Sequence, residues 1–270
     1  MTSVSGGLCS AMPSTSGASA LPEAVVPPPE PALLLARAIP ASLVDGPGSR
    51  LTLFLQGCNL DCVNCHNPSL IGMSNAASWR TIDELIERLR HEAPFLRGVT
   101  VSGGEATLQL EGVIALFTAI KTDPELARLT TLVDSNGTLD TAGWQHLAPV
   151  MDGAMIDVKA VDPQIHRRIT GSGNAAVLRS VRTLYDLDRL HEVRLLVIEG
   201  LTDTPDELAR YAGFLAGIDP TIPLRTMGFR HHGVRAKGRV WPETSPETVE
   251  RVARTLRDLG LTDVRTPSVS

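Results

Sequence analysis

The chain has 270 residues, of which 43% are hydrophobic, and it carries a formal net charge of -5. This length suits one large α/β domain or two small ones, and the acidic balance argues against a general nucleic-acid-binding protein. No stretch approaches the roughly 18 apolar residues of a membrane span, and the start lacks the basic segment of a signal peptide. We therefore expect a cytoplasmic protein that does not enter a membrane and whose thiols stay reduced.

Residues 1–35 are rich in Ser, Gly, Ala and Pro, and V-P-P-P-E-P lies near their end. Such a composition buries too little apolar surface to offset the entropy that is lost on ordering. We predict a disordered extension over residues 1–35, in which Cys9 has no role. The folded domain is expected over residues 36–270.

From residue 51 onward, short apolar runs alternate with amphipathic segments. The predicted strands are Leu51–Gln56, Gly98–Ser102, Thr130–Asp134, Ala154–Val158, Val193–Ile198 and Pro223–Phe229. The predicted helices begin near Thr81, Leu110, Thr141, Ala175, Thr204 and Ser245. Six such units indicate a parallel α/β fold, either a sheet covered on both faces or an incomplete barrel, because an eight-stranded barrel would need eight.

Three cysteines, Cys58, Cys62 and Cys65, have the spacing C-x3-C-x2-C, and no fourth cysteine lies nearby. A cubane iron–sulfur cluster has four irons and usually four thiolate ligands, so three thiolates would leave one iron open to a substrate or cofactor. The same residues with His66 are also an accepted zinc set. Zinc ligands usually form two separated pairs, whereas these four lie within nine residues. The spacing therefore favours the cluster over zinc or inert cysteines.

Unusual polar and glycine residues lie in or after the predicted strands. They are Gly103, Gly104 and Glu105; Asp134, Ser135 and Asn136; Asp157 and Lys159; Arg194; and His231 with His232. Active sites of parallel α/β folds are built at the carboxyl ends of the strands. Each residue has an ordinary alternative, such as a tight glycine turn, an Asx turn or a solvated charge. Their occurrence together with the cysteine segment favours a functional site.

Several segments, in this order, resemble the radical S-adenosylmethionine (SAM) enzymes. C-x3-C-x2-C is the signature of that superfamily. The resemblance is closest to its glycyl radical enzyme activating enzymes, and it rests on V-D-G-P-G-S-R, F-L-Q-G-C-N-L-D-C-V-N-C-H-N-P, S-G-G-E-A-T-L-Q, D-S-N-G, M-I-D-V-K and I-H-R-R-I-T-G-S-G-N. It covers residues from about 45 to 174, with weaker similarity beyond. The resemblance implies a partial (β/α)6 barrel of the radical SAM type, which agrees with the six units above.

The resemblance also implies one [4Fe-4S] cluster on Cys58, Cys62 and Cys65, with SAM on the open iron. By the resemblance, Asn64, His66, Gly104, Glu105, Asp157, Lys159 and His231 lie around SAM. The positions in or after the strands add Gly103, Asp134, Ser135 and Arg194 to the expected cofactor-binding residues. A monovalent cation is implied nearby, with Asp134, Ser135, Met155 and Asp157 at its ligand positions. Asn64 departs from the family, in which an aromatic residue often packs on adenine at this position. The cysteine-rich ferredoxin-like insert of many relatives is absent, so no second cluster is expected.

By this resemblance the protein reduces SAM by one electron. The resulting 5′-deoxyadenosyl radical would take a hydrogen atom from a glycine of a partner glycyl radical enzyme, and no general base is needed. We expect an oxidoreductase that is a monomer and that receives electrons from a flavodoxin or a ferredoxin-type donor. Two alternatives stay open, because a resemblance does not establish a substrate: another radical SAM reaction on a small molecule or peptide, and a zinc-binding protein without catalysis.

Overall fold

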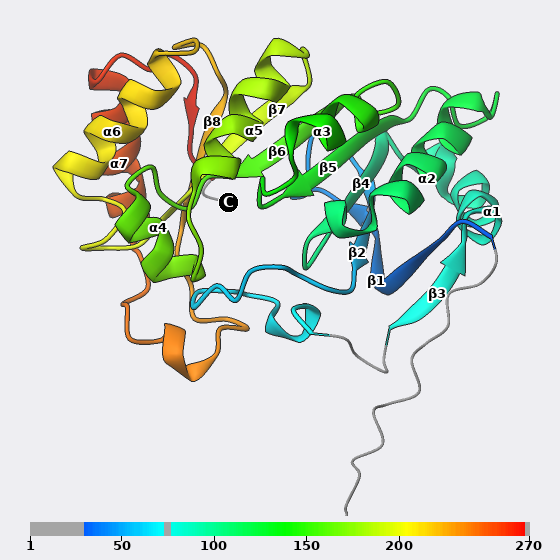
Figure 1. Ribbon diagram of the computed structural model, residues 1–270, viewed down its shortest axis with the longest axis horizontal. Helices are drawn as coiled ribbons and strands as arrows, with labels where there is room; N and C mark the ends of the chain where they lie inside the picture. Colours follow the sequence, from blue (N-terminus) through cyan, green and yellow to red (C-terminus); the bar gives the residue numbers. More distant parts are fainter. Residues whose placement is uncertain (1–29, 73–76, 268–270) are drawn as a thin grey trace, which may run out of the picture.

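The computed structural model describes residues 30–72 and 77–267. Its centre is a nine-stranded sheet with the order β3-β1-β2-β4-β5-β6-β7-β8-β9 (Figure 1). The strands are β1 Ala32–Ser42, β2 Arg50–Leu55, β3 Ser78–Thr81, β4 Gly98–Gly103, β5 Thr130–Ser135, β6 Gly153–Asp157, β7 Leu190–Val197, β8 Leu224–Gly228 and β9 Val264–Arg265. All neighbours from β2 to β9 are parallel. Because the two end strands do not pair with each other, this is an unclosed barrel, and the predicted fold class is confirmed.

Seven α-helices accompany the described strands. They are α1 Ile82–Glu92, α2 Leu110–Thr122, α3 Thr141–Leu147, α4 Pro163–Thr170, α5 Ala175–Asp186, α6 Pro205–Ala216 and α7 Pro246–Asp258. The predicted capping box is present: the Glu84 backbone N–H donates to Thr81 Oγ1 over 3.3 Å, and the Thr81 N–H donates to Glu84 Oε2 over 3.1 Å. These bonds satisfy two N–H groups that an open helix end leaves without partners. None of the described helices is long and apolar enough to cross a membrane.

The core lies between the parallel strands and the helices that cover them. All six residues of β2 are buried, including Leu51, Leu53 and Leu55, and β4 is buried over its first five residues. Strands buried on both faces read as continuous apolar runs. The helices therefore cover the outside of the barrel, and the polar residues at the strand ends are left to form a site.

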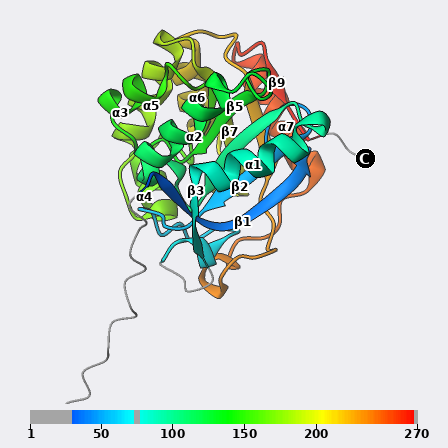
Figure 2. The ribbon, with the colours of Figure 1, turned by 90° about the vertical axis from the view of Figure 1, so that its right-hand side faces the viewer.

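Two features at the start of the domain correct the predicted organisation. The boundary at residue 35 is too late, because β1 begins at Ala32 and Leu33 is fully buried. This strand pairs antiparallel with both β2 and β3, and α1 packs against β1 and β3 (Figure 2). The proline-rich composition just before it concealed the leucine run of β1. Residues 1–29, with Cys9, lie outside the described residues.

Candidate metal and cofactor site

A cavity of about 420 Å³ lies at the carboxyl ends of the parallel strands. Most of the predicted site residues line it: Cys58, Cys62, Asn64, Cys65, His66, Gly103, Gly104, Asp134, Ser135, Asp157, Lys159 and Arg194. They come from the segment after β2 and from β4, β5, β6 and β7. The barrel thus brings together residues that are up to 136 positions apart in the chain.

The cysteine loop, residues 57–67, leaves β2 through Gly57, whose φ of +101° favours glycine. Backbone bonds fix the start of the loop: the Gly57 N–H donates to the Leu70 carbonyl over 2.9 Å, and the Glu105 N–H donates to the Gly57 carbonyl over 2.8 Å. Farther along, the Val63 N–H donates to the Ile169 carbonyl at the end of α4 over 2.8 Å. All three cysteines of this loop are free thiols and half-buried.

The donor set fits a cluster better than a single ion. Among the described residues, no three His, Cys, Asp or Glu side chains converge as they would on one metal ion, and His66 Nε2 is engaged with the Arg230 carbonyl at 3.0 Å. Each thiolate of a cubane binds its own iron, so the sulfurs need to surround a volume rather than meet at a point. Three free thiols around one cavity satisfy that condition, which weakens the zinc alternative.

Burial favours the protonated form of two of these thiols in the protein without metal. It raises the pKa of Cys58, and it raises the pKa of Cys62 to about 11, although the Lys159 charge opposes the second shift. A metal binds the thiolate, so ligation must displace these protons.

The β8–α7 loop, residues 229–245, holds the cysteine loop from outside. A Cβ on Gly233 would lie 2.1 Å from the His66 carbonyl oxygen, and one on Gly238 would lie 2.1 Å from that of Val63. Only glycine permits such close approach of two backbones. The Arg235 guanidinium donates from Nη2 to the Cys62 carbonyl over 3.1 Å.

An outer network of charges joins the same two loops. The Asp61 carboxylate of the cysteine loop forms ion pairs with Arg235 and, over 2.6 Å, with Lys237. Both cations of the β8–α7 loop are therefore bound to the cysteine loop.

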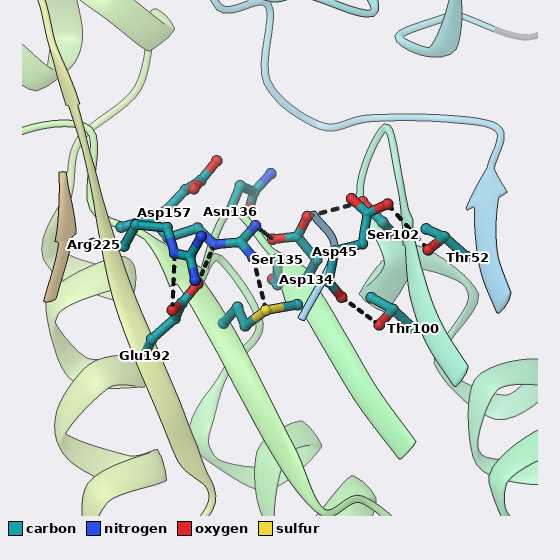
Figure 3. A network of polar contacts seen from close by, with 12 residues as sticks. Asp45, Thr52, Thr100, Ser102, Asp134, Ser135, Asn136, Asp157, Glu192 and Arg225 are labelled. Atoms are coloured by element: carbon teal, nitrogen blue, oxygen red, sulfur yellow. Dashed lines mark hydrogen bonds and ion pairs between the residues drawn. The ribbon is translucent and has the colours of Figure 1, made fainter. Parts of the chain in front are cut away.

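An inner network of charges lies among the strands (Figure 3). Arg194 of β7 donates from Nε to Glu192 over 2.7 Å and from Nη1 to Asp134 over 3.0 Å. Glu192 also accepts from Arg225 Nε of β8 over 3.2 Å, and Asp134 accepts from Ser102 Oγ over 3.0 Å. Burial raises the pKa of Asp134, although the Arg194 charge opposes that shift.

A second buried pair stands beside the cavity. Lys159 Nζ lies 2.5 Å from the Asp157 carboxylate. Burial disfavours the ammonium form of Lys159, but the Asp157 charge outweighs this and raises the pKa of Lys159. The lysine therefore keeps its positive charge at the cavity wall, where a ligand carboxylate could meet it.

Arg194 lies among the side chains at the positions expected for a monovalent cation. It contacts Asp134 Oδ1 at 3.0 Å and Met155 Sδ at 2.8 Å, and it supplies a positive charge there. The cation stays a prediction.

Two predicted residues, Glu105 and His231, do not line the cavity. The buried Glu105 carboxylate accepts from Ser135 Oγ over 2.8 Å, from the Asn136 N–H over 2.7 Å, and from both the N–H and the hydroxyl of Thr107. His231 donates from Nε2 to the Trp241 carbonyl over 2.7 Å. Contacts of these two residues with SAM stay predictions.

Asn64 has an unsatisfied polar atom in the site. The residue is 3% exposed and lines the cavity, yet its Oδ1 has no hydrogen-bond partner among the described residues. A buried acceptor without a partner costs free energy. A ligand N–H group in the cavity would remove that cost, so this residue fits a bound cofactor.

The sequence reasoning assigned no role to Asp45, which lines the cavity from the loop between β1 and β2. Its carboxylate accepts from Ser42 Oγ over 2.6 Å and from Thr52 Oγ1 over 3.1 Å. Arg50, the fully buried first residue of β2, donates to Thr100 Oγ1 of β4 over 2.7 Å and to the Pro47 carbonyl of the same loop over 3.3 Å. Burial lowers the pKa of Arg50 to about 10. The V-D-G-P-G-S-R segment marks this loop as part of the resemblance, but the sequence does not show that the Asp45 side chain faces the cavity.

Comparison with known proteins finds relatives that agree with one another. The family described as the radical SAM superfamily matches residues 52–212. A pyruvate formate-lyase-activating enzyme of Streptococcus mutans serotype c (strain ATCC 700610 / UA159) is 33% identical over 196 residues, which are 68% of this chain and 74% of the relative. The enzyme of that name from Staphylococcus aureus (strain USA300) is 33% identical over 200 residues, 71% of this chain and 78% of the relative.

Solved structures are similar in fold. A domain of pyruvate-formate lyase-activating enzyme from Bacteroides vulgatus ATCC 8482 has a TM-score of 0.52 at 22% identity, over 63% of this chain and 99% of that domain. A radical SAM methyltransferase from Sphaerobacter thermophilus has a TM-score of 0.58 at 18% identity, over 80% of this chain and 66% of that chain. At these identities the likeness concerns the fold alone.

Proposed function

Because this chain belongs to the radical SAM superfamily, in the branch of the pyruvate formate-lyase-activating enzymes, we propose that it activates a glycyl radical enzyme. The activity would be the reductive cleavage of SAM followed by removal of a hydrogen atom from a glycine of the partner. One observation carries the proposal: a single cavity joins three free thiols to Asp45 of the D-G-P-G segment. A radical SAM reaction on a small molecule or peptide remains the alternative that the same cavity would serve.

The residues of the chain have distinct roles in this proposal. Cys58, Cys62 and Cys65 would hold the [4Fe-4S] cluster. When bound, the cluster supplies one electron and SAM supplies the carbon radical that takes the hydrogen atom. The positive charges of Lys159 and Arg194 at the cavity wall would attract the carboxylate of SAM, as charge-assisted hydrogen bonds do.

Partner proteins follow from the same proposal. The glycine to be activated belongs to another polypeptide, and the electron comes from a flavodoxin or ferredoxin-type donor. We propose that the chain acts as a monomer in a reducing cytoplasm, where its free thiols can bind iron.

The test is anaerobic reconstitution followed by incubation with SAM, dithionite and a pyruvate formate-lyase as partner. We expect about four irons per chain, 5′-deoxyadenosine as a product, and a glycyl radical in the partner by electron paramagnetic resonance. Changing Cys58 to Ala should abolish all three, while Cys9→Ala should change none. SAM cleavage without a radical in any glycyl radical enzyme would favour the alternative substrate class.

A further inference from the structure

Two segments that are far apart in the chain surround the cysteine loop with positive charge. The last turn of α4 carries Arg167 and Arg168, and it meets the loop where the Val63 N–H donates to the Ile169 carbonyl over 2.8 Å. The β8–α7 loop approaches from the other side through Gly238 and Arg235. Figure 1 shows α4 in green and the β8–α7 loop in orange beside the cyan cysteine loop.

The charge of this region is opposite to that of the whole chain. The β8–α7 loop, residues 229–245, contains four Arg or Lys residues and one carboxylate, Glu243, and the last turn of α4 adds two arginines. The cysteine loop contributes one carboxylate, Asp61, in a chain of net charge -5. We call the exposed cations around the loop the basic surface; its members are Arg167, Arg168, Arg230, Lys237 and Arg239.

Three of the five cations of the basic surface form no ion pair among the described residues, whereas Arg230 lies near the Glu243 carboxylate. Lys237 pairs with Asp61. Within the described part of the chain, Arg167, Arg168 and Arg239 form no ion pair with a carboxylate; Arg239 contacts only the Val234 carbonyl. Val240, which is exposed, adds an apolar contact next to Arg239. Unpaired cations beside an exposed aliphatic side chain are what an acidic protein surface would complement.

We propose that the basic surface binds an acidic electron-donor protein, which reaches the metal site through the cysteine loop. This inference rests on the proposed function, because the donor is needed only if the site takes up an electron. None of the five cations is among the residues that line the cavity, so a donor bound to them need not fill the space for SAM and the glycine. In the transfer, the donor is oxidised by one electron and the cluster is reduced by one; no bond forms or breaks and no proton moves.

The test uses flavodoxin in its hydroquinone form as the probe and the reconstituted holoprotein. We compare Arg167→Ser/Arg168→Ser with a matched control, Arg179→Ser/Arg182→Ser, which removes two exposed arginines from α5. The first variant should bind flavodoxin about three- to tenfold more weakly at low salt, with a flatter salt dependence and slower reduction of the cluster. The control should behave like the parent protein.

Dithionite separates this inference from the proposed function. With dithionite, which does not need the basic surface, both variants should cleave SAM like the parent. If dithionite gives no cleavage even in the parent, the proposed function fails, while the binding measurement still decides the docking surface. Equal flavodoxin binding by the variant and control would overturn the inference. Tighter binding of single-stranded DNA than of flavodoxin would also overturn it and assign the surface to polyanions in general.

Discussion

The inner and outer networks use the same chemistry in opposite surroundings. In the inner network, the side chains of Arg194 and Glu192 are 8% and 3% exposed, and both stand on strand β7. In the outer network, Asp61 and Lys237 are 57% and 46% exposed and stand on two loops. One network is fixed by the sheet, whereas the other joins two segments that the sheet does not hold together. Ion pairs of similar length, 2.7 Å for Arg194–Glu192 and 2.6 Å for Lys237–Asp61, therefore lie in different surroundings.

The free energies differ because water screens the outer network but not the inner one. Breaking a buried ion pair leaves a charge without water or a partner, whereas exposed pairs contribute little to folding. The inner network should therefore matter for stability, and the outer network for the position of the cysteine loop.

Changing Arg194 to Met should have the largest effect. It leaves the Glu192 and Asp134 carboxylates without their main partner, and the free energy of unfolding should fall by about 3–5 kcal/mol. Urea unfolding of the metal-free protein measures this. The control is Arg225→Met, because Arg225 makes only one bond, 3.2 Å long, to Glu192 and is 35% exposed; its loss should cost about 1 kcal/mol. Equal midpoints for the two variants would show that burial does not distinguish the networks.

Asn64 combines features of both regions, because it is buried like the inner network but stands on the cysteine loop. Replacing it with Leu removes an amide oxygen that has no partner, so the metal-free protein should gain about 1 kcal/mol of stability. SAM binding to the reconstituted protein, measured by calorimetry, should weaken. If Asn64→Leu instead destabilises the metal-free protein, its amide makes an internal bond after all.

The matched control for Asn64 is Asn174, also buried. Its Nδ2 donates to the carbonyls of Ala160 and Val161 over 3.1 and 2.7 Å. Asn174→Leu should therefore cost about 1–3 kcal/mol in the same urea experiment. If the free energy of unfolding rises for Asn64→Leu and falls for Asn174→Leu, the Asn64 side-chain amide does not stabilise the fold, whereas that of Asn174 does.

The sequence predicted what depends on local pattern. The six parallel strands follow from apolar runs such as Leu51–Gln56, and α1 follows from its capping box at Thr81. The strand ends then placed Asp134 and Lys159 at one cavity. In these cases the information lies within a few residues of the element.

The sequence did not predict what depends on contacts between distant segments. No pattern in the sequence pairs Arg235 and Lys237 with Asp61, which the fold brings beside them. The Glu105 carboxylate accepts from Ser135 Oγ and from the Asn136 N–H, contacts that no local pattern indicated, and its contact with SAM stays a prediction. No local pattern states which partner a long charged side chain finds, so these contacts required the structure.

The outer network gives the smallest expected change in stability. Arg235→Met should lower the free energy of unfolding by about 1 kcal/mol or less, because its ion pair with Asp61 is exposed. Arg235 nevertheless bonds the backbone carbonyl of Cys62 over 3.1 Å, so its loss should free the middle of the cysteine loop. We expect the reconstituted variant to lose iron to a chelator severalfold faster than the parent protein. The loss of visible absorbance under anaerobic conditions measures the rate.

Lys237→Met is the control that isolates this contact. Lys237 bonds Asp61 but not the backbone of the cysteine loop, so its removal weakens the same ion-pair group and leaves the bond from Arg235 to Cys62 in place. Its stability change should match that of Arg235→Met, and its iron release should stay near that of the parent. Equal iron release by the two variants would mean that charge alone, and not the bond to Cys62, retains the metal. In that case the outer network would differ from the inner one in exposure, but not by holding the backbone of the cysteine loop in position.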